Sequence, residues 1–265
     1  MRFGICTSLD HAVYAAEAGC DYIESIAATL VPAQDEVAFA PIREQILASP
    51  VPLEVLNVFI PGEIKITGPS VDLPALQIYM DTLMRRAKEV GVSVIVFGSG
   101  GARSAPEGFA VEQAREQFVD VVRMAGDTAM KYGLTITVEP IHAGGCNILN
   151  RVEQGMVIVD RLNHPNVKLL ADLFHMTKVG EPFANIVAAA GRFGHIHTGT
   201  PSLPETAEGE QLDFREFLDA VVKAGYDGRI SVEDNNGLFQ WKQLPLTAGF
   251  RAAIEYVKAQ LPVKA

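Results

Sequence analysis

The feature that most constrains the fold is a local pattern that recurs along the chain. A helix-like segment closes on a glycine, and a short apolar segment follows, in AEAGCDYIES, AKEVGVSVIVFGSGG, AMKYGLTITVEP and VVKAGYDGRISVED. Glycine adopts the left-handed turn at the end of a helix without a Cβ clash. The apolar segments are nearly continuous, as expected for parallel strands that are covered on both faces. The pattern therefore predicts helices alternating with parallel strands.

Eight strands and eight helices can be placed along the 265 residues. We expect strands near 2–6, 21–25, 52–57, 93–97, 134–139, 167–172, 193–197 and 229–233. We expect helices near 10–18, 34–48, 74–90, 110–132, 150–163, 181–190, 213–224 and 244–260, with Asn150 and Glu153 forming a capping box. This order is typical of an α/β protein with a single (β/α)8 TIM barrel in one domain, residues 1–265. A doubly wound sheet is the alternative, but CTSLDHA stands where that fold needs a glycine-rich phosphate loop.

The composition describes a chain with a large core and an acidic balance. Apolar residues make up 48% of the chain and the formal net charge is −10, which argues against a nucleic-acid-binding protein. Cys6, Cys20 and Cys146 show no paired spacing, so we expect reduced thiols and a cytoplasmic protein. The first expected strand begins almost at Met1, and no apolar run approaches the length of a membrane span. We therefore expect no signal peptide and no membrane partner.

Four polar side chains stand at the ends of the last four expected strands: Glu139, Asp172, His197 and Glu233. Strand ends of this kind converge at one mouth of a parallel barrel. Carboxylates that converge would repel one another unless a divalent cation lay among them. Oxygen-rich donors with a single nitrogen favour Mn²⁺, Mg²⁺ or Co²⁺ over a structural zinc site. The alternative for any one of the acidic residues is that it only caps the next helix, but four consecutive strand ends weaken that explanation for the set.

The segments VEP, LLADLFHM, GHIHTG and ISVED resemble the xylose-isomerase-like TIM-barrel superfamily, especially its ketose 3-epimerases and hydroxypyruvate isomerases. The resemblance implies that Glu139, Asp172, His197 and Glu233 bind one divalent metal ion of the Mn²⁺ type. It also implies that His175 contacts the substrate. The implied reaction is isomerisation or epimerisation of a sugar or related hydroxy-carbonyl compound through an enediolate, with Glu139 and Glu233 as the catalytic acid and base.

Other histidines and one asparagine are weaker candidates. His195 and His197 point to the same face of their strand, but only His197 lies at the C-terminal end, where barrel enzymes bind substrate. We therefore expect His195 in the interior. His142, in the loop after Glu139, and Asn57, at the end of strand three, could contact the substrate. A solvated loop position for His142 and a turn role for Asn57 are the alternatives.

Two positions depart from the ketose 3-epimerase pattern. Gly145 stands where those enzymes carry a second glutamate, and Leu203 stands where they carry an arginine. Both of the missing side chains grip substrate oxygens in the family, so we expect a substrate other than a free ketohexose. The Gly144–Gly145 pair is expected to open space or to bring backbone amides towards the ligand. Arg103 is either a replacement cation or an ordinary surface residue.

Other functions remain open. A lyase or dehydratase could use the same enolisation on a keto-inositol, a dehydroshikimate-like acid or an oxidised glycoside. Phosphodiester cleavage, as in the apurinic endonucleases of the superfamily, needs more histidines than this chain can spare, and the complete ligand set disfavours a non-enzymatic sugar-binding barrel. Trp241, in the apolar segment FQWKQLPL, could cover the pocket or a partner subunit in a homo-oligomer.

Overall fold

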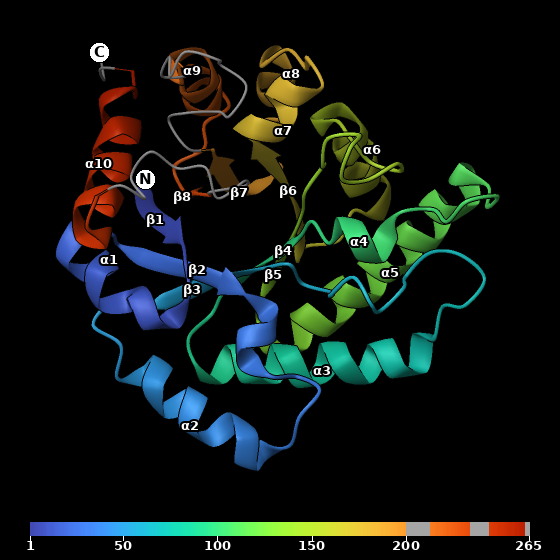
Figure 1. The fold of residues 1–265 in the computed structure, drawn as a ribbon. Helices are drawn as coiled ribbons and strands as arrows, with labels where there is room; N and C mark the ends of the chain where they lie inside the picture. The colour runs from blue at the N-terminus through green and yellow to red at the C-terminus, as the bar shows by residue number, and fades with distance from the viewer. Residues whose placement is uncertain (200–212, 234–243, 263–265) are drawn as a thin grey trace.

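Eight parallel strands form the centre of the molecule, in a computed structural model that describes residues 1–199, 213–233 and 244–262 (Figure 1). Each strand pairs with its neighbours in chain order, and β1 also pairs with β8, which closes the barrel. The (β/α)8 fold expected from the sequence is therefore confirmed. The strands are β1 (Arg2–Cys6), β2 (Tyr22–Ile26), β3 (Leu53–Asn57), β4 (Val94–Phe97), β5 (Thr135–Val138), β6 (Val167–Asp172), β7 (Phe193–Thr198) and β8 (Arg229–Val232).

Helices surround the strands (Figure 1). The longer ones are α1 (Ala12–Ala18), α2 (Glu36–Leu47), α3 (Leu73–Glu89), α5 (Val111–Tyr132), α6 (Val152–Leu162), α9 (Arg215–Lys223) and α10 (Leu246–Ala259). The shorter ones are η1 (Leu9–His11), η2 (Ala27–Leu30), α4 (Gly100–Arg103), α7 (Leu173–Lys178) and α8 (Ala184–Ala188). Each expected strand agrees with an observed one to within one residue. The short helices α4, which begins three residues after the end of β4, and α7, which directly follows β6, were not expected from the sequence.

The start of α6 differs from the expected capping box. The side chain of Asn150 donates to the carbonyl oxygen of Ile141 instead of capping the helix, and Glu153 makes no capping contact with it. Glu181, distant in the sequence, accepts from the backbone N–H of Val152 at 2.9 Å and of Glu153 at 3.2 Å. A carboxylate placed by tertiary structure therefore replaces the local cap.

The barrel interior below the mouth is filled by side chains. Tyr22 on β2 is fully buried. A Cβ atom at Gly4 on β1 would overlap its ring, so the glycine leaves the space that the ring fills. The Tyr22 hydroxyl lies 2.9 Å from Ser231 Oγ on β8, the strand on the other side of β1. A packed interior confines chemistry to the C-terminal mouth.

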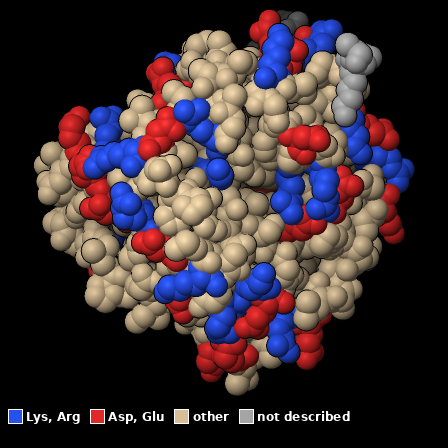
Figure 2. Space-filling view, turned by 180° about the vertical axis from the view of Figure 1, so that it is seen from behind, with Lys and Arg blue, Asp and Glu red and all other residues tan. Residues whose placement is uncertain are grey.

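The surface carries charges of both signs. Figure 2 shows Lys and Arg interspersed with Asp and Glu on one face of the molecule. Exposed ion pairs such as Arg161 with Glu116 and Arg192 with Asp160 join neighbouring elements at 2.6 Å. Pairs of this kind add little stability because water screens them. Among the helices in the described part of the chain, none is both long and apolar enough to cross a membrane.

Candidate metal centre and active site

The ends of β5 to β8 bring the four candidate ligands together at the mouth of the barrel. His197, on β7, lies at the centre: its Nδ1 is 3.4 Å from Glu139 Oε1, 3.7 Å from Asp172 Oδ2 and 3.2 Å from Glu233 Oε2. One donor atom from each of the four lies within 4.8 Å of all the others. We call these residues the four-donor cluster. Donors this close together are what a single bound cation requires.

Three atoms of the four-donor cluster are buried without a hydrogen-bond partner: Glu139 Oε1, Asp172 Oδ2 and His197 Nδ1. Unpaired buried polar atoms are uncommon, and each costs about 1–3 kcal/mol. A cation at their centre would satisfy all three at once. The donor set of three carboxylates and one imidazole therefore fits a divalent metal ion.

Asp172 uses its two oxygen atoms for different purposes. It ends β6 and is also the N-cap of α7, where Oδ1 accepts from the backbone N–H of His175 at 2.7 Å. Its Oδ2 faces His197 in the four-donor cluster. The capping explanation is thus correct for this residue and is compatible with metal binding. The cap fixes the orientation of the carboxylate and places His175 beside the cluster.

Glu139 follows β5 directly and depends on a glycine of the neighbouring strand end. A Cβ atom at Gly98, the first residue after β4, would overlap Glu139 Oε2. Only glycine leaves room for the carboxylate in this position. The sequence analysis did not identify Gly98, although a glycine directly after a barrel strand was the signal that could have revealed it.

Arg103 is a buried structural residue, so both expectations for it were wrong. Its guanidinium donates to the carbonyl oxygens of Phe97 at 3.1 Å and Glu139 at 2.7 Å, and its Nε lies 3.3 Å from Cys146 Sγ. It also stacks on the ring of Phe118, with 5.0 Å to the centroid. These contacts hold the ends of β4 and β5 together, and the side chain is fully buried.

Glu24 is a second residue that the sequence analysis did not identify. It is fully buried on β2, and its two oxygens lie 3.0 Å from His197 Nε2 and 2.9 Å from His195 Nε2. The bond to His197 favours a proton on Nε2, which leaves Nδ1 to face the four-donor cluster. His195 lies in the interior, as expected, and also contacts Ser231 Oγ at 3.1 Å. The signal for Glu24 was a lone charge within the apolar strand YIESI.

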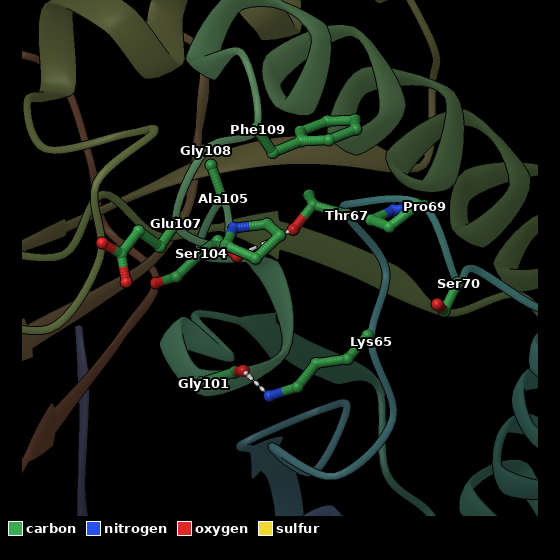
Figure 3. A pocket seen from close by; sticks show the side chains of 11 residues that line it. Lys65, Thr67, Pro69, Ser70, Gly101, Ser104, Ala105, Glu107, Gly108 and Phe109 are labelled. Atoms are coloured by element: carbon green, nitrogen blue, oxygen red, sulfur yellow. Dashed lines mark hydrogen bonds between the residues drawn. The ribbon is translucent and has the colours of Figure 1, made fainter.

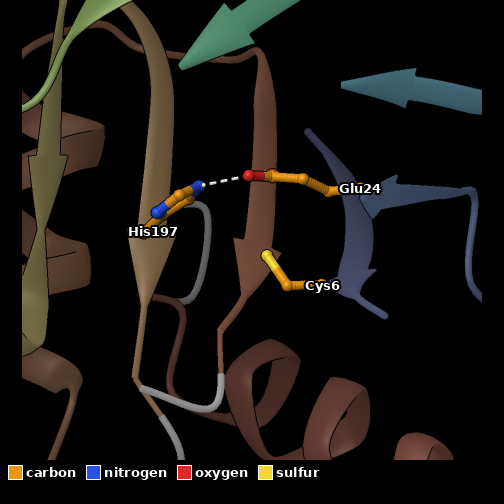
Figure 4. A group of neighbouring side chains, drawn as sticks. All are labelled: Cys6, Glu24 and His197. Atoms are coloured by element: carbon orange, nitrogen blue, oxygen red, sulfur yellow. Dashed lines mark hydrogen bonds and ion pairs between the residues drawn. The ribbon is translucent and has the colours of Figure 1, made fainter. Parts of the chain in front are cut away.

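Cys6, Glu24 and His197 form another close group of donor atoms (Figure 4). Both oxygens of Glu24 already accept hydrogen bonds from imidazoles. Burial, followed by the negative charges of Glu24 and Glu233, raises the pKa of the Cys6 thiol well above its usual range. Metal ions bind the thiolate rather than the thiol. This group therefore supports His197 and is not itself a metal site.

His175 and His142 form a stacked pair next to Glu139. Their ring centroids are 5.1 Å apart with 23° between the planes, and their Nδ1 atoms are 3.1 Å apart. His175 Nε2 lies 3.9 Å from Glu139 Oε1. Burial lowers the pKa of His175, which favours a neutral ring. A neutral imidazole held by its partner in this way can present its other nitrogen to a ligand.

Burial and charge both change the acid–base behaviour of the four-donor cluster. Burial, followed by the charge of Glu233, raises the pKa of Asp172 to about 7, and burial also raises the pKa of Glu139. Burial acts to lower the pKa of His197, but the charges of Glu24 and Glu233 outweigh it and hold that pKa well above its usual range. Without a cation the cluster therefore retains protons that a metal ion would displace.

Asn57 lies on a cavity of 320 Å³ between the ends of β1, β2 and β3. Its Oδ1 is buried without a hydrogen-bond partner. Glu233 lines the same cavity, which joins it to the four-donor cluster. The structure thus places Asn57 beside the four-donor cluster, on the cavity that Glu233 also lines.

A separate cavity of 620 Å³ lies between the loop after β3 and the segment after β4 (Figure 3). Lys65 Nζ donates to the carbonyl oxygens of Gly62 at 2.5 Å and Gly101 at 2.7 Å. Thr67 Oγ1 donates to the carbonyl oxygen of Arg103 at 2.9 Å. These polar groups join the two segments instead of facing a ligand.

Of the two positions that depart from the ketose 3-epimerase pattern, the structure describes only Gly145. Leu203 and Trp241 lie outside the described residues. Gly145 lies in a turn, where its N–H donates to the carbonyl oxygen of His142 at 2.9 Å and a Cβ atom would overlap the side chain of Ile141. Of the two expectations for the Gly144–Gly145 pair, the structure contradicts an amide directed towards a ligand at Gly145, because the turn already uses that N–H.

Comparisons with known proteins agree with this geometry. Residues 12–260 match the xylose isomerase-like TIM barrel family. L-ribulose 3-epimerase of Methylomonas sp. (strain DH-1) is 28% identical over 250 residues, which are 87% of this chain and 82% of the relative. A structure of D-psicose 3-epimerase with D-tagatose from Clostridium cellulolyticum H10 has a TM-score of 0.80 at 18% identity, over 99% of this chain and 100% of that one. A structure of the IOLI protein with a zinc atom has a TM-score of 0.76 at 20% identity, over 98% of each chain. The protein therefore belongs to the xylose isomerase-like TIM barrel family.

Proposed function

We propose that the protein is a divalent-metal-dependent isomerase or epimerase that acts on a sugar or a related hydroxy-carbonyl compound. The observation that carries this proposal is the four-donor cluster, with its three buried atoms that lack hydrogen-bond partners. The L-ribulose and D-psicose 3-epimerases among its relatives support a small carbohydrate substrate. The free cysteines support a reducing compartment such as the cytoplasm.

The four-donor cluster would hold one divalent cation through Glu139, Asp172, His197 and Glu233. Mn²⁺ suits this oxygen-rich set best, with Mg²⁺ and Co²⁺ as alternatives. The zinc atom in the IOLI protein supports a metal site in a barrel of this kind. When bound, the cation would polarise the substrate carbonyl and stabilise the negative charge of an enediolate.

Glu139 and Glu233 are the proposed acid and base. One carboxylate removes the proton next to the carbonyl, and the other returns a proton to the opposite face. Each carboxylate has two oxygen atoms, so one can face the cation while the other holds the proton. The two residues stand at the ends of β5 and β8, which are separated by two strands in the ring. They can therefore approach different faces of one substrate.

The neighbouring polar residues are proposed to position the substrate. His175 would hold a substrate oxygen as charge moves onto it, because its Nε2 lies close to Glu139. His142 would keep His175 in place through the contact between their Nδ1 atoms. Asn57 would accept a hydrogen bond from a substrate hydroxyl in the adjoining cavity.

Hydrogen exchange in D₂O tests the proposed chemistry. Metal-stripped protein reconstituted with Mn²⁺ should exchange a hydrogen next to the carbonyl of an active substrate, as followed by NMR. Glu233→Gln should abolish the exchange while retaining the fold. Glu112→Gln, an exposed control outside the site, should retain it. Loss of a β-leaving group together with exchange would reveal a lyase that uses the same step. A substrate converted without exchange from solvent, and without transfer of its own hydrogen between positions, would overturn the proposal.

A further inference from the structure

The cavity of 320 Å³ beside Glu233 has a distinct chemical character. It opens between the ends of β1, β2 and β3, and it is lined by Cys6, Thr7, Ser8, Glu24, Ser25, Ile26, Thr29, Asn57, Val58 and Glu233. Four of these side chains carry hydroxyl groups and two carry carboxylates. No lysine or arginine is among the described residues that line it.

The hydrogen-bonding groups of this cavity favour a ligand that donates hydrogen bonds. Asn57 Oδ1 is a buried acceptor without a partner, and the carboxylate of Glu233 can only accept when it is ionised. Ser25 Oγ and Thr29 Oγ1 lie 3.1 Å apart, and this contact uses only one of their two hydroxyl hydrogens. The other hydrogen and the remaining lone pairs are left for a ligand. Hydroxyl groups, which both donate and accept, match this arrangement.

The charges around the cavity act in the same direction. Glu24 is fully buried at its edge, and Glu233 extends from the four-donor cluster into it. A phosphate or carboxylate placed here would find no lysine or arginine among the described residues of the lining to pair with. Burying an anion without a cationic partner is costly, and this cost selects against charged ligands.

We propose that the end of the substrate remote from the reacting carbonyl lies in this cavity, and that this end is hydroxylated and uncharged. The inference rests on the proposed function, because Glu233 links the cavity to the reacting centre. It favours keto-inositols, oxidised glycosides and free ketoses other than ketohexoses over sugar phosphates and hydroxy-keto acids. Among the relatives' chemistries, it therefore separates sugar substrates from acid substrates.

Matched substrates provide the first test. The protein with Mn²⁺ would first be assayed with free ketoses and with their terminal phosphate esters. A second comparison sets an uncharged pair, a keto-inositol and an oxidised glycoside, against a charged pair, hydroxypyruvate and a 2-oxo-tetronate. We expect kcat/KM to favour the uncharged member by about tenfold or more, the size of one lost polar contact. Equal or better turnover of the phosphate esters or the acids would overturn the inference.

A variant of the cavity provides the second test. Thr29→Val removes one hydroxyl with little change of shape, and Thr247→Val on α10 is the control outside the site. We expect KM for the preferred long substrate to rise about tenfold in Thr29→Val, with a much smaller effect on deuterium exchange of dihydroxyacetone, which has no remote end. Equal effects on both substrates would overturn the cavity assignment alone. A wild-type protein that exchanges neither substrate would instead contradict the proposed function.

Discussion

Two groups of buried polar side chains meet at His197, and they differ in how their hydrogen bonds are satisfied. The interior group consists of Tyr22, Glu24, His195 and Ser231, which are connected by contacts of 2.9–3.1 Å. The four-donor cluster lies above it, and three of its atoms have no partner. His197 belongs to both groups, with Nε2 towards the interior and Nδ1 towards the cluster.

The interior group has its hydrogen bonds largely satisfied in the folded chain, whereas the four-donor cluster needs a ligand to satisfy its polar atoms. In the interior group both oxygens of Glu24 are paired, and the one unpaired nitrogen, His195 Nδ1, is an acceptor in a ring whose pKa burial lowers. In the four-donor cluster the donor atoms of the four residues lie within 4.8 Å of one another. Polar atoms left unpaired in this way are expected at functional sites, where local stability is given up for binding.

The largest expected effect comes from removing a donor of the four-donor cluster. Asp172→Asn keeps an oxygen that can cap α7 but removes the negative charge. Its affinity for Mn²⁺ should fall by more than the roughly 10- to 100-fold that outer partners of a metal contribute. Its Tm without metal should not fall, because repulsion among the carboxylates is relieved. Calorimetric titration and thermal unfolding measure the two quantities, with exposed Asp160→Asn as the control. Unchanged Mn²⁺ affinity would remove Asp172 from the site.

The next effect comes from the interior group. Glu24→Gln keeps the shape of the side chain but weakens its hold on the Nε2–H of His197. Affinity for Mn²⁺ should fall roughly 10- to 100-fold, as for other residues that orient a metal ligand. Restoration by Glu24→Asp is not expected, because the shorter side chain cannot reach both histidines. If Glu24→Gln lowers Tm but leaves Mn²⁺ affinity intact, the interior group is purely structural and the comparison fails.

The pH dependence should distinguish the metal-free and metal-bound states. The raised pKa values of Asp172, about 7, and of His197 mean that these two groups bind more protons in the folded metal-free protein than in the unfolded chain. Their contribution to the stability should therefore fall as the pH rises from about 4 to about 7 and beyond. Metal binding must displace these protons, so affinity should rise about tenfold per pH unit for each displaced proton below its pKa. The increase in Tm caused by Mn²⁺ should be larger at pH 8 than at pH 6. A smaller increase at pH 8 would contradict the proton assignment.

The smallest effect is expected at Gly98. In Gly98→Ala the new methyl group would overlap Glu139 Oε2, which lies at the flexible end of its side chain. The cost should be about 1 kcal/mol, or roughly fivefold in Mn²⁺ affinity. Gly62→Ala is the control, because its Cβ would meet no atom closer than 3.6 Å. A larger loss in the control than in Gly98→Ala would show that the effect does not come from Glu139.

The sequence allowed the barrel and the four-donor cluster to be predicted because both depend on local patterns. A glycine before each of several apolar segments marked strands, and a polar residue at the end of each of the last four strands marked the mouth. Glu24 does not stand at the end of a strand, so the pattern of strand ends could not reveal it. The lone charge in YIESI marks the residue but not its partner His197, which is 173 residues away. Arg103 was misread because only the fold shows that its guanidinium lies between the ends of β4 and β5.

The same limit applies to Asp172 and Glu181. The sequence placed Asp172 either on a metal or on a helix cap, and the structure shows that its two oxygens can serve both purposes. Glu181 caps α6 from another part of the chain, where the local pattern had indicated Asn150. Contacts that depend on which segments meet in space are not encoded in the spacing of neighbouring residues.

The central claim is that the four-donor cluster binds one divalent cation at the point its unpaired atoms face. A crystal grown with Mn²⁺ and measured at the manganese absorption edge tests this most directly. We expect a single anomalous peak within about 2.0–2.6 Å of Glu139, Asp172 and Glu233 oxygens and of His197 Nδ1. Absence of a peak there at saturating Mn²⁺, or a peak bound by other residues, would contradict it.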